Sequence, residues 1–399
     1  MRKTLLASGL AAAFILVGCG GGSDATTTTT DTIGYVVDAP VQNMNYDCVA
    51  DGTENHATGA DGAFTCQNMS QVRFRLGNLV LGEISGLPQD GYVFPQDIVG
   101  VDRANLEDAR VTAMAQLLQS LDEDGNLDNG IQIPQDVGNQ FSAETFTATQ
   151  LGTYLDEASV SPVRVRTELR ARQHLRDSML SVGVAINNST FDINSYPMYP
   201  LTQELNDTIV YMGNEERMAY DVYTNLYTYH INNGIEIKQL LNIPENSESR
   251  HIEIVQSIVR KYNLDATTVI TNPVADSNVT LAEMPSGEYG VPAVQALYDA
   301  LYAKGITSKQ AALEAGCMVE VTDVNDLNAD IELAIEAGAE DIVAAYNILR
   351  DGSYNHYWAF DKGLKNMGVT DGCCSLGTVD GVNYCHPEYP QISHGNGNQ

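Results

Sequence analysis

Between residues 201 and 367 the sequence repeatedly places acidic and histidine side chains on apolar helical stripes. The clearest case is Glu248 and His251, because residues three apart project from one face of a helix. The same stripe continues through Val255 and Ile258 in steps of four and three. Burying a carboxylate and an imidazole is costly without compensation, and a metal ion is one compensation. The pattern therefore predicts a helical fold with a polar centre.

The first of three further segments is the expected helix over residues 201–230. Its heptad stripe carries one charged residue, Glu216, while the neighbouring Glu215 points about 100° away and is expected to be solvated. Ser247 is expected to cap the helix that carries Glu248, and an acid in a first helical turn is favourable without any metal. A lone histidine on an apolar stripe is usually hydrogen-bonded within a core. Each residue taken singly thus has a plainer explanation.

Two helices towards the C-terminus complete the set. The expected helix over residues 308–327 aligns Glu320 and Asp323, and the expected helix over residues 339–367 places His356 among apolar residues. Four carboxylates and two imidazoles suit two transition-metal ions held between helices. We therefore predict a site for iron or another divalent transition metal, with a di-metal centre as one option, formed by Glu216, Glu248, His251, Glu320, Asp323 and His356.

Four stretches of this region carry a family resemblance: YMGNEERMAYDVYTNLY, SESRHIEIVQSIVRKY, AGCMVEVTDVNDL and DIVAAYNILRDGSYNHYWAF. They resemble a ferritin-like family of bacteria and archaea that is catalogued as a domain of unknown function. The resemblance covers residues 201–366 and implies a four-helix bundle related to ferritins and rubrerythrins, with a metal centre between the helices. In ferritin-like di-iron proteins a glutamate stands where this chain has Ser353, and Asp323 could restore the carboxylate count.

The resemblance also implies a chemistry. If iron occupies the site, the expected reaction is oxidation of Fe²⁺ by oxygen or peroxide, as in di-iron oxidases and peroxidases. The sequence has no rubredoxin-like C-x-x-C pairs, so no built-in electron-transfer partner is visible. Tyr220 and Tyr223 are candidate electron donors, and their plainer explanation is aromatic packing at helical spacing.

The N-terminus has the features of a bacterial lipoprotein. Residues 1–18 combine a short basic start with an apolar run too short to span a bilayer. The sequence up to Cys19 resembles a lipobox, which implies cleavage before this cysteine and acylation of it. Residues 19–32 would then form a flexible tether to the membrane. The expected location is the cell envelope, at the outer membrane if the host is Gram-negative; the alternative is an ordinary secretory signal.

The charge of the chain limits its partners. The formal net charge is −31, and removal of residues 1–18 would take away two basic residues and no acid. Such a surface repels nucleic acid, which is therefore not an expected partner. Another envelope protein is a candidate partner, and the sequence does not give the oligomeric state.

Six cysteines remain after Cys19, in a chain with export features where disulfides persist. Cys48 and Cys66 lie in one strand-rich region and are the expected pair. The pairing of one cysteine in the bundle and of the three in the tail, residues 368–399, stays open, and the two adjacent cysteines of the tail seldom pair with each other. Zinc is an alternative there, since His386 follows a cysteine. The four open cysteines are Cys317, Cys373, Cys374 and Cys385.

The first half of the chain predicts a different architecture. Residues 33–103 read as short strands separated by turns, and they resemble a carboxypeptidase-regulatory-like or Cna-B-like β-sandwich. A helical extension is expected over residues 104–182, followed by a linker over 183–200 and the helical bundle over 201–367. The predicted fold is multidomain α+β.

A second cation site is conceivable within the helical extension. Oxygen-bearing side chains alternate at Asp122, Asp124, Asn126 and Asp128, which could wrap Ca²⁺. The glycine falls at the fourth position and Ile133 stands at the twelfth, so the EF-hand pattern fails. An ordinary turn explains the same residues.

These observations leave three hypotheses. The first is an anchored envelope lipoprotein whose ferritin-like domain binds iron or a similar metal, with oxidase- or peroxidase-type activity. The second is a non-enzymatic surface protein whose bundle holds no functional metal, and the third is a calcium-dependent adhesion protein. Metal content separates the first from the second.

Overall fold

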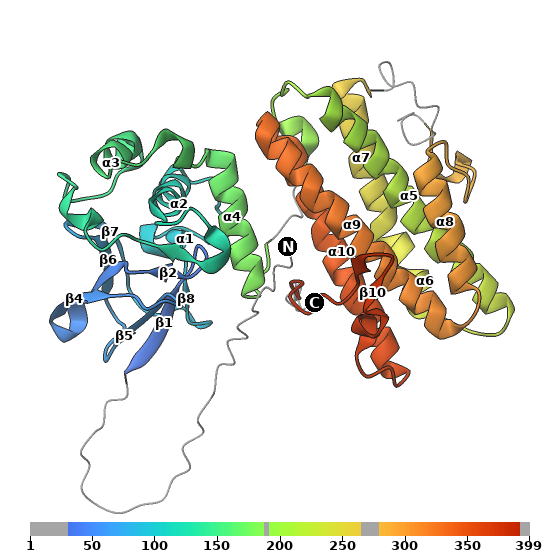
Figure 1. Cartoon of the computed structure of the whole chain (residues 1–399), viewed down its shortest axis with the longest axis horizontal. Coiled ribbons are helices and arrows are strands. Elements are labelled where there is room, and N and C mark those ends of the chain that lie inside the picture. Colours follow the sequence, from blue (N-terminus) through green and yellow to red (C-terminus); the bar gives the residue numbers. More distant parts are fainter. Residues whose placement is uncertain (1–30, 187–190, 265–278, 392–399) are drawn as a thin grey trace, which may run out of the picture. The chain divides into compact units, whose positions relative to one another are not determined.

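The computed structural model describes residues 31–186, 191–264 and 279–391. The predicted signal peptide and the lipidation site Cys19 lie outside the described residues, as do nearly all of the tether and part of the predicted linker. The chain divides into two compact units, residues 1–179 and 180–399 (Figure 1). The expected mixed α+β class is confirmed. Among the helices of the described residues, none combines the length and the apolar character needed to cross a bilayer.

The strands of the first unit form small sheets. One sheet has the order β4-β3-β6-β7 and another the order β5-β1-β8, while β2 and β9 form a separate parallel pair. The bounds are β1 Thr32–Val36, β2 Val41–Gln42, β3 Asn45–Cys48, β4 Thr53–Ala57, β5 Ala63–Cys66, β6 Val72–Leu76, β7 Leu79–Ile84, β8 Tyr92–Val93 and β9 Ile131–Gln132.

Strand β6 shows why these residues form sheet. Val72, Phe74 and Leu76 are buried while Arg73 and Arg75 between them are partly exposed, which is the alternation of a strand with one face on a core. A disulfide joins Cys48 of β3 to Cys66 of β5 and so links the two larger sheets.

The described residues from 31 to 181 contain four α-helices, of which the last ends just past the boundary of the first unit: α1 Pro95–Val99, α2 Ala109–Leu121, α3 Leu151–Glu157 and α4 Glu168–Ser181. Helices α1 to α3 lie along one side of the strands (Figure 1). Residues of the strands, α1, α2 and α3 share one hydrophobic core, which includes Phe64, Leu117 and Tyr154.

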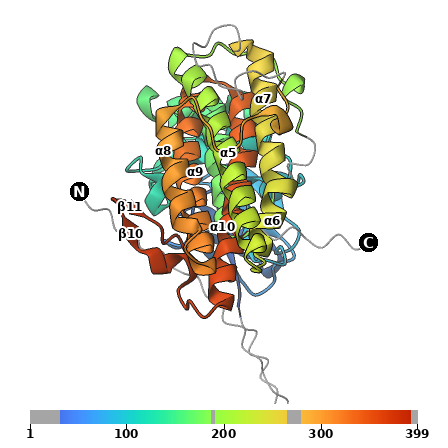
Figure 2. The same ribbon diagram turned by 90° about the vertical axis from the view of Figure 1, so that its right-hand side faces the viewer.

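The second unit is built from helices. Four of them, α5, α7, α9 and α10, pack side by side, with α5 against α7 and α9 and with α10 against α7 and α9 (Figure 2). Helix α8 packs against α5 and α9. The bounds are α5 Gln203–Asn232, α6 Lys238–Ile243, the π-helical segment η7 Pro244–Glu248, α7 Ser249–Tyr262, α8 Pro292–Gly305, α9 Lys309–Ala337 and α10 Glu340–Asn366.

Local chemistry sets the ends of these helices. The hydroxyl of Thr202 accepts from Leu205 N at the start of α5, and the hydroxyl of Ser308 accepts from Ala311 N at the start of α9. Helix α9 continues ten residues beyond the expected end at 327, up to its C-cap Gly338, which adopts a φ of 67°. The expectation of a shorter helix was wrong.

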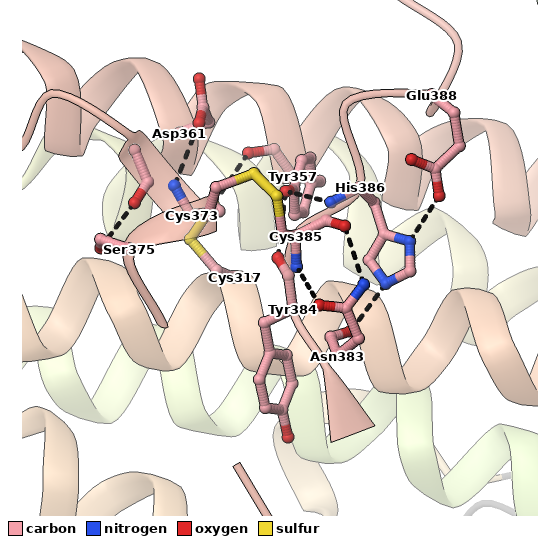
Figure 3. The surroundings of a disulfide bond; sticks show 12 residues. Cys317, Tyr357, Asp361, Cys373, Ser375, Asn383, Tyr384, Cys385, His386 and Glu388 are labelled. Atoms are coloured by element: carbon pink, nitrogen blue, oxygen red, sulfur yellow. Dashed lines mark hydrogen bonds and ion pairs between the residues drawn. A yellow bond between two sulfur atoms is a disulfide. The ribbon is translucent and has the colours of Figure 1, made fainter. Parts of the chain in front are cut away.

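The tail forms a small cap on the second unit (Figure 3). It consists of the 3₁₀ turn η10 Gly372–Leu376 and the hairpin strands β10 Thr378–Val379 and β11 Val382–Asn383. Disulfides join Cys317 of α9 to Cys373, and Cys374 to Cys385. The pairings left open by the sequence are thereby settled.

Zinc is not favoured in this cap. Its three cysteines, together with Cys317 of α9, are in disulfides and cannot supply thiolates. Both ring nitrogens of His386 already have partners, Glu388 Oε1 at 2.7 Å and the Asn383 carbonyl at 2.7 Å (Figure 3). The Tyr357 hydroxyl accepts from His386 N and donates to the Tyr384 carbonyl, both at 3.1 Å, which ties the cap to α10.

Candidate metal centre

Five of the six predicted ligands meet at one point inside the helical unit. They come from four packed helical segments, with the continuous η7 and α7 counted as one, and each is only 1–6 % exposed. Glu216 belongs to α5, Glu248 ends η7, His251 lies in the first turn of α7, Glu320 belongs to α9 and His356 belongs to α10.

The helix that carries Glu248 does not begin where the sequence indicated. Segments α6, η7 and α7 run on without a break, so Ser247 is not an N-cap and Glu248 is not a first-turn acid exposed to a helix dipole. The Ser247 hydroxyl instead lies 3.3 Å from His251 Nε2. The π-helical turn widens the helix at the position that carries Glu248, and such turns are frequent at functional sites.

The first triad consists of Glu216, Glu248 and His251. One ligand atom of each lies within 4.8 Å of the others. His251 Nδ1 is 3.0 Å from Glu216 Oε2 and 3.3 Å from Glu248 Oε2. With Nδ1 facing the carboxylates and Nε2 facing Ser247, the ring has the arrangement of a metal-binding histidine held by a second partner.

Gly352 of α10 makes room for this ring. A Cβ atom at Gly352 would lie 2.5 Å from both Cε1 and Nε2 of His251. Sequence reasoning missed this residue. The signal was a glycine in the middle of a helix, which costs about 1 kcal/mol relative to alanine and therefore calls for a packing reason.

The second triad consists of Glu248, Glu320 and His356, again with ligand atoms within 4.8 Å of one another. His356 Nδ1 is 2.9 Å from Glu248 Oε1 and 3.4 Å from Glu320 Oε2. The Tyr223 hydroxyl donates to Glu320 Oε1 and fixes that carboxylate. The ring centroids of the two histidines are 5.8 Å apart.

Glu248 is common to both triads, and its two oxygens face different histidines. Oε2 lies towards His251 and Oε1 towards His356. A carboxylate placed in this way can bridge two metal ions, each with one histidine and one further glutamate.

The electrostatics of the metal-free centre follow from the same contacts. Burial raises the pKa of Glu216 to about 7, although His251 opposes the rise. Burial would also raise the pKa of Glu248, but His356 and His251 outweigh it and hold that pKa below its usual range. Burial lowers the pKa of His356, yet Glu320 and Glu248 raise it to about 10. The metal-free centre is thus a set of buried ion pairs.

Several atoms of the centre remain unsatisfied. Within the described part of the chain, Glu216 Oε1 and Asp323 Oδ1 are buried without a hydrogen-bond partner, and His356 Nδ1 makes no hydrogen bond despite its short distance to Glu248. Buried polar atoms of this kind are rare in folded proteins and call for an explanation. Carboxylates, and imidazoles that release a proton when an ion binds, are donors that fit a divalent transition metal.

Asp323, the sixth predicted ligand, lies beside the centre but in neither triad. The Ser353 hydroxyl donates to its Oδ2. Ser353 lies three residues before His356, at the position of α10 where the family resemblance predicts a glutamate. Its hydrogen bond therefore holds the Asp323 carboxylate next to that position. Burial, followed by Glu216 and Glu215, raises the pKa of Asp323 well above its ordinary value.

Glu215 differs from the sequence expectation. It was expected to be solvated, but it is only 1 % exposed. The reason is that α9 covers the side of α5 on which Glu215 lies, so a residue 100° away from the inward stripe is still buried.

Two of the predicted calcium ligands, Asp122 and Asp124, make hydrogen bonds that stabilise the turn in which they lie. Asp122 Oδ1 accepts from Gln132 N, while Asp124 accepts from Asn126 N and from Asn129 Nδ2 at 2.8 Å each. Asn126 precedes the 3₁₀ turn Leu127–Asn129, and Asp128 lies within it. Calcium binding there stays a prediction. A third group of ligand types, Cys48, Asp51 and Cys66, cannot supply thiolates because its cysteines are bonded to each other.

Comparison with known proteins places the similarity in the helical unit. The family described as "Uncharacterized protein domain (DUF2202)" matches residues 205–378. The "Uncharacterized protein MJ0754" of Methanocaldococcus jannaschii is 33 % identical over 176 residues, which are 44 % of this chain and 83 % of that protein. The crystal structure of the hypothetical protein MJ0754 from Methanococcus jannaschii DSM 2661 has 32 % sequence identity and a TM-score of 0.36, covering 43 % of this chain and 86 % of that one.

Proposed function

We propose, for a chain that belongs to the DUF2202 family of uncharacterized proteins, that the helical unit is a ferritin-like four-helix bundle that binds two ions of iron or a similar divalent metal. The observation that carries this proposal is the pair of buried carboxylate–histidine triads that share Glu248. A core without metal would gain nothing from burying three glutamates and two histidines together, since replacing such ion pairs by apolar residues is often neutral or stabilising.

Each residue of the two triads would have a defined role in metal binding. Glu216 and His251 would hold one ion, Glu320 and His356 the other, and Glu248 would bridge them. Bound iron would supply one-electron redox chemistry, with oxidation of Fe²⁺ by oxygen or peroxide as the expected reaction. Tyr223 orients Glu320, and Ser247 orients His251.

We also propose that the protein is a lipoprotein of the cell envelope, anchored through Cys19. Support comes from the signal-like start of the sequence and from three disulfides, which persist in oxidising compartments. In this arrangement the first unit would stand between the anchor and the metal-binding unit along the chain.

Metal analysis of the purified full chain tests the proposal. After anaerobic loading with Fe²⁺ and removal of free metal, we expect about two irons per chain in the parent and loss of both in Glu248→Ala/His251→Ala, because both triads lose a ligand. Glu253→Gln, an exposed site on α7, is the matched control and should load like the parent.

Circular dichroism shows whether each variant is folded. Trace metal in a folded parent would contradict the proposal and leave a structural or partner-binding helical protein.

A further inference from the structure

A second group of acids, three of them buried and one partly exposed, lies next to the metal centre and outside both triads. Two stripes at helical spacing carry it, one on α5 and one on α9. The residues of the first are Thr208, Tyr211 and Glu215, and those of the second are Asp323, Asp326 and Asp330. The stripes face each other in antiparallel order, since Asp330 lies beside Thr208 and Asp326 contacts Glu215.

Glu215 is the most unusual member. Its side chain is almost fully buried, and neither carboxylate oxygen has a hydrogen-bond partner among residues 31–186, 191–264 and 279–391. The charged groups that act on it, Asp326, Glu216 and Asp330, are all acidic. Two carboxyl groups in contact without a donor need a shared proton or a cation between them.

Two further atoms point to a ligand in the same place. In the described structure Asp323 Oδ1 is buried without a partner, and so is the hydroxyl oxygen of Tyr346, which α10 contributes. Burial raises the pKa of Tyr346, and Asp330 adds to the rise because this hydroxyl lies beside the acidic stripe. The region therefore offers oxygen atoms from three helices with unused lone pairs.

The acids also connect the surface with the centre. Asp326 is partly exposed, Glu215 behind it is buried, and next to Glu215 come Asp323 and Glu216, the latter a ligand of the first triad. A cation loses hydration as it enters a protein, and carboxylates along its path offset that cost. The triads themselves are buried, so an ion needs such a path.

We propose that Glu215 and Asp326 form a transit site for divalent cations, through which metal passes from solvent to Asp323 and then to the buried centre. This inference rests on the proposed metal centre. Glu215 acts as a positioning residue for the ion in transit and holds no metal at equilibrium.

The rate of metal uptake tests this role. Co²⁺ is a suitable probe because its visible absorption reports binding to nitrogen and oxygen ligands. After stopped-flow mixing with the metal-free full chain, we expect Glu215→Gln to take up Co²⁺ about tenfold more slowly than the parent, since the path loses a charge. The final metal content, measured by elemental analysis after long incubation, should equal that of the parent.

Thermal melting of the metal-free variant gives a second readout. The amide of Glu215→Gln can donate to Asp326, so the melting temperature should rise. If Glu215 only held the fold together through a shared proton with Asp326, the melting temperature would fall and the uptake rate would not change.

Glu204→Gln is the matched control, because Glu204 is an exposed acid on the same helix. Equal uptake rates in Glu215→Gln and Glu204→Gln, with a parent that binds Co²⁺, would overturn the transit site and leave the metal centre intact. A folded parent that binds no Co²⁺ would overturn both proposals.

Discussion

At the scale of single residues, the candidate centre depends on side chains that share an inward helical face and on the neighbours that pack around them. Helical spacing brought Glu216 and His251 to the centre because i, i+3 and i+4 positions share a face. The same argument failed for Glu215, since burial on a second side depends on the neighbour that α9 provides. Gly352 went unnoticed because its role lies in a contact with a residue about 100 positions away in the sequence.

The Gly352 contact leads to a prediction for the first triad. In Gly352→Ala the added methyl group would overlap the His251 ring, which its bonds to Glu216 and Ser247 hold in place. We expect a loss of about 1–3 kcal/mol in unfolding free energy and a lower metal content by elemental analysis.

Gly363→Ala in the same helix is the control, because there the closest atom is the flexible end of Gln239. If both variants keep the metal content of the parent, His251 does not bind metal in the position described.

At the scale of elements, periodicity predicted α5 and α10 to within a few residues, since both have clear stripes and recognisable ends. It did not predict the π-helical turn η7. That turn keeps the chain helical and leaves no capping pattern for the sequence to show, so the only visible signal was Ser247, which suggested a helix start. The strands of the first unit were visible from their alternation, whereas their sheet order depends on pairings between distant segments.

The facing stripes of α5 and α9 predict how stability changes with pH. Burial, together with Asp326, raises the pKa of Asp330 from 3.8 to about 7. The folded protein then holds this proton more tightly than the unfolded chain, so the stabilisation is complete below pH 3.8 and is lost as pH rises through about 7. Linkage sets an upper limit of about 4 kcal/mol on this loss.

Asp330→Asn has no such proton to lose. The Asp326, Thr208 and Tyr346 groups around it remain in place, so the melting temperature of the metal-free variant should fall less between pH 4 and pH 7 than that of the parent. Glu336→Gln, an exposed site on α9, should follow the parent. Parallel curves for Asp330→Asn and the parent would show that Asp330 is not protonated in the folded state.

At the scale of the whole molecule, composition and motifs indicated two different halves, and the chain does divide into two units near residue 180. Cysteine counting indicated disulfides, but the pairing of Cys317 with Cys373 could not be predicted, because it depends on how the cap folds back onto α9. The central claim also belongs to this scale, since the two triads exist only when four helical elements pack together.

Anomalous diffraction from crystals of the iron-loaded protein tests that claim most directly. Our account predicts two anomalous peaks at the iron edge on either side of the Glu248 carboxylate, one next to Glu216 and His251 and the other next to Glu320 and His356. A single site elsewhere in the chain, or an empty centre in crystals grown with iron, would contradict it.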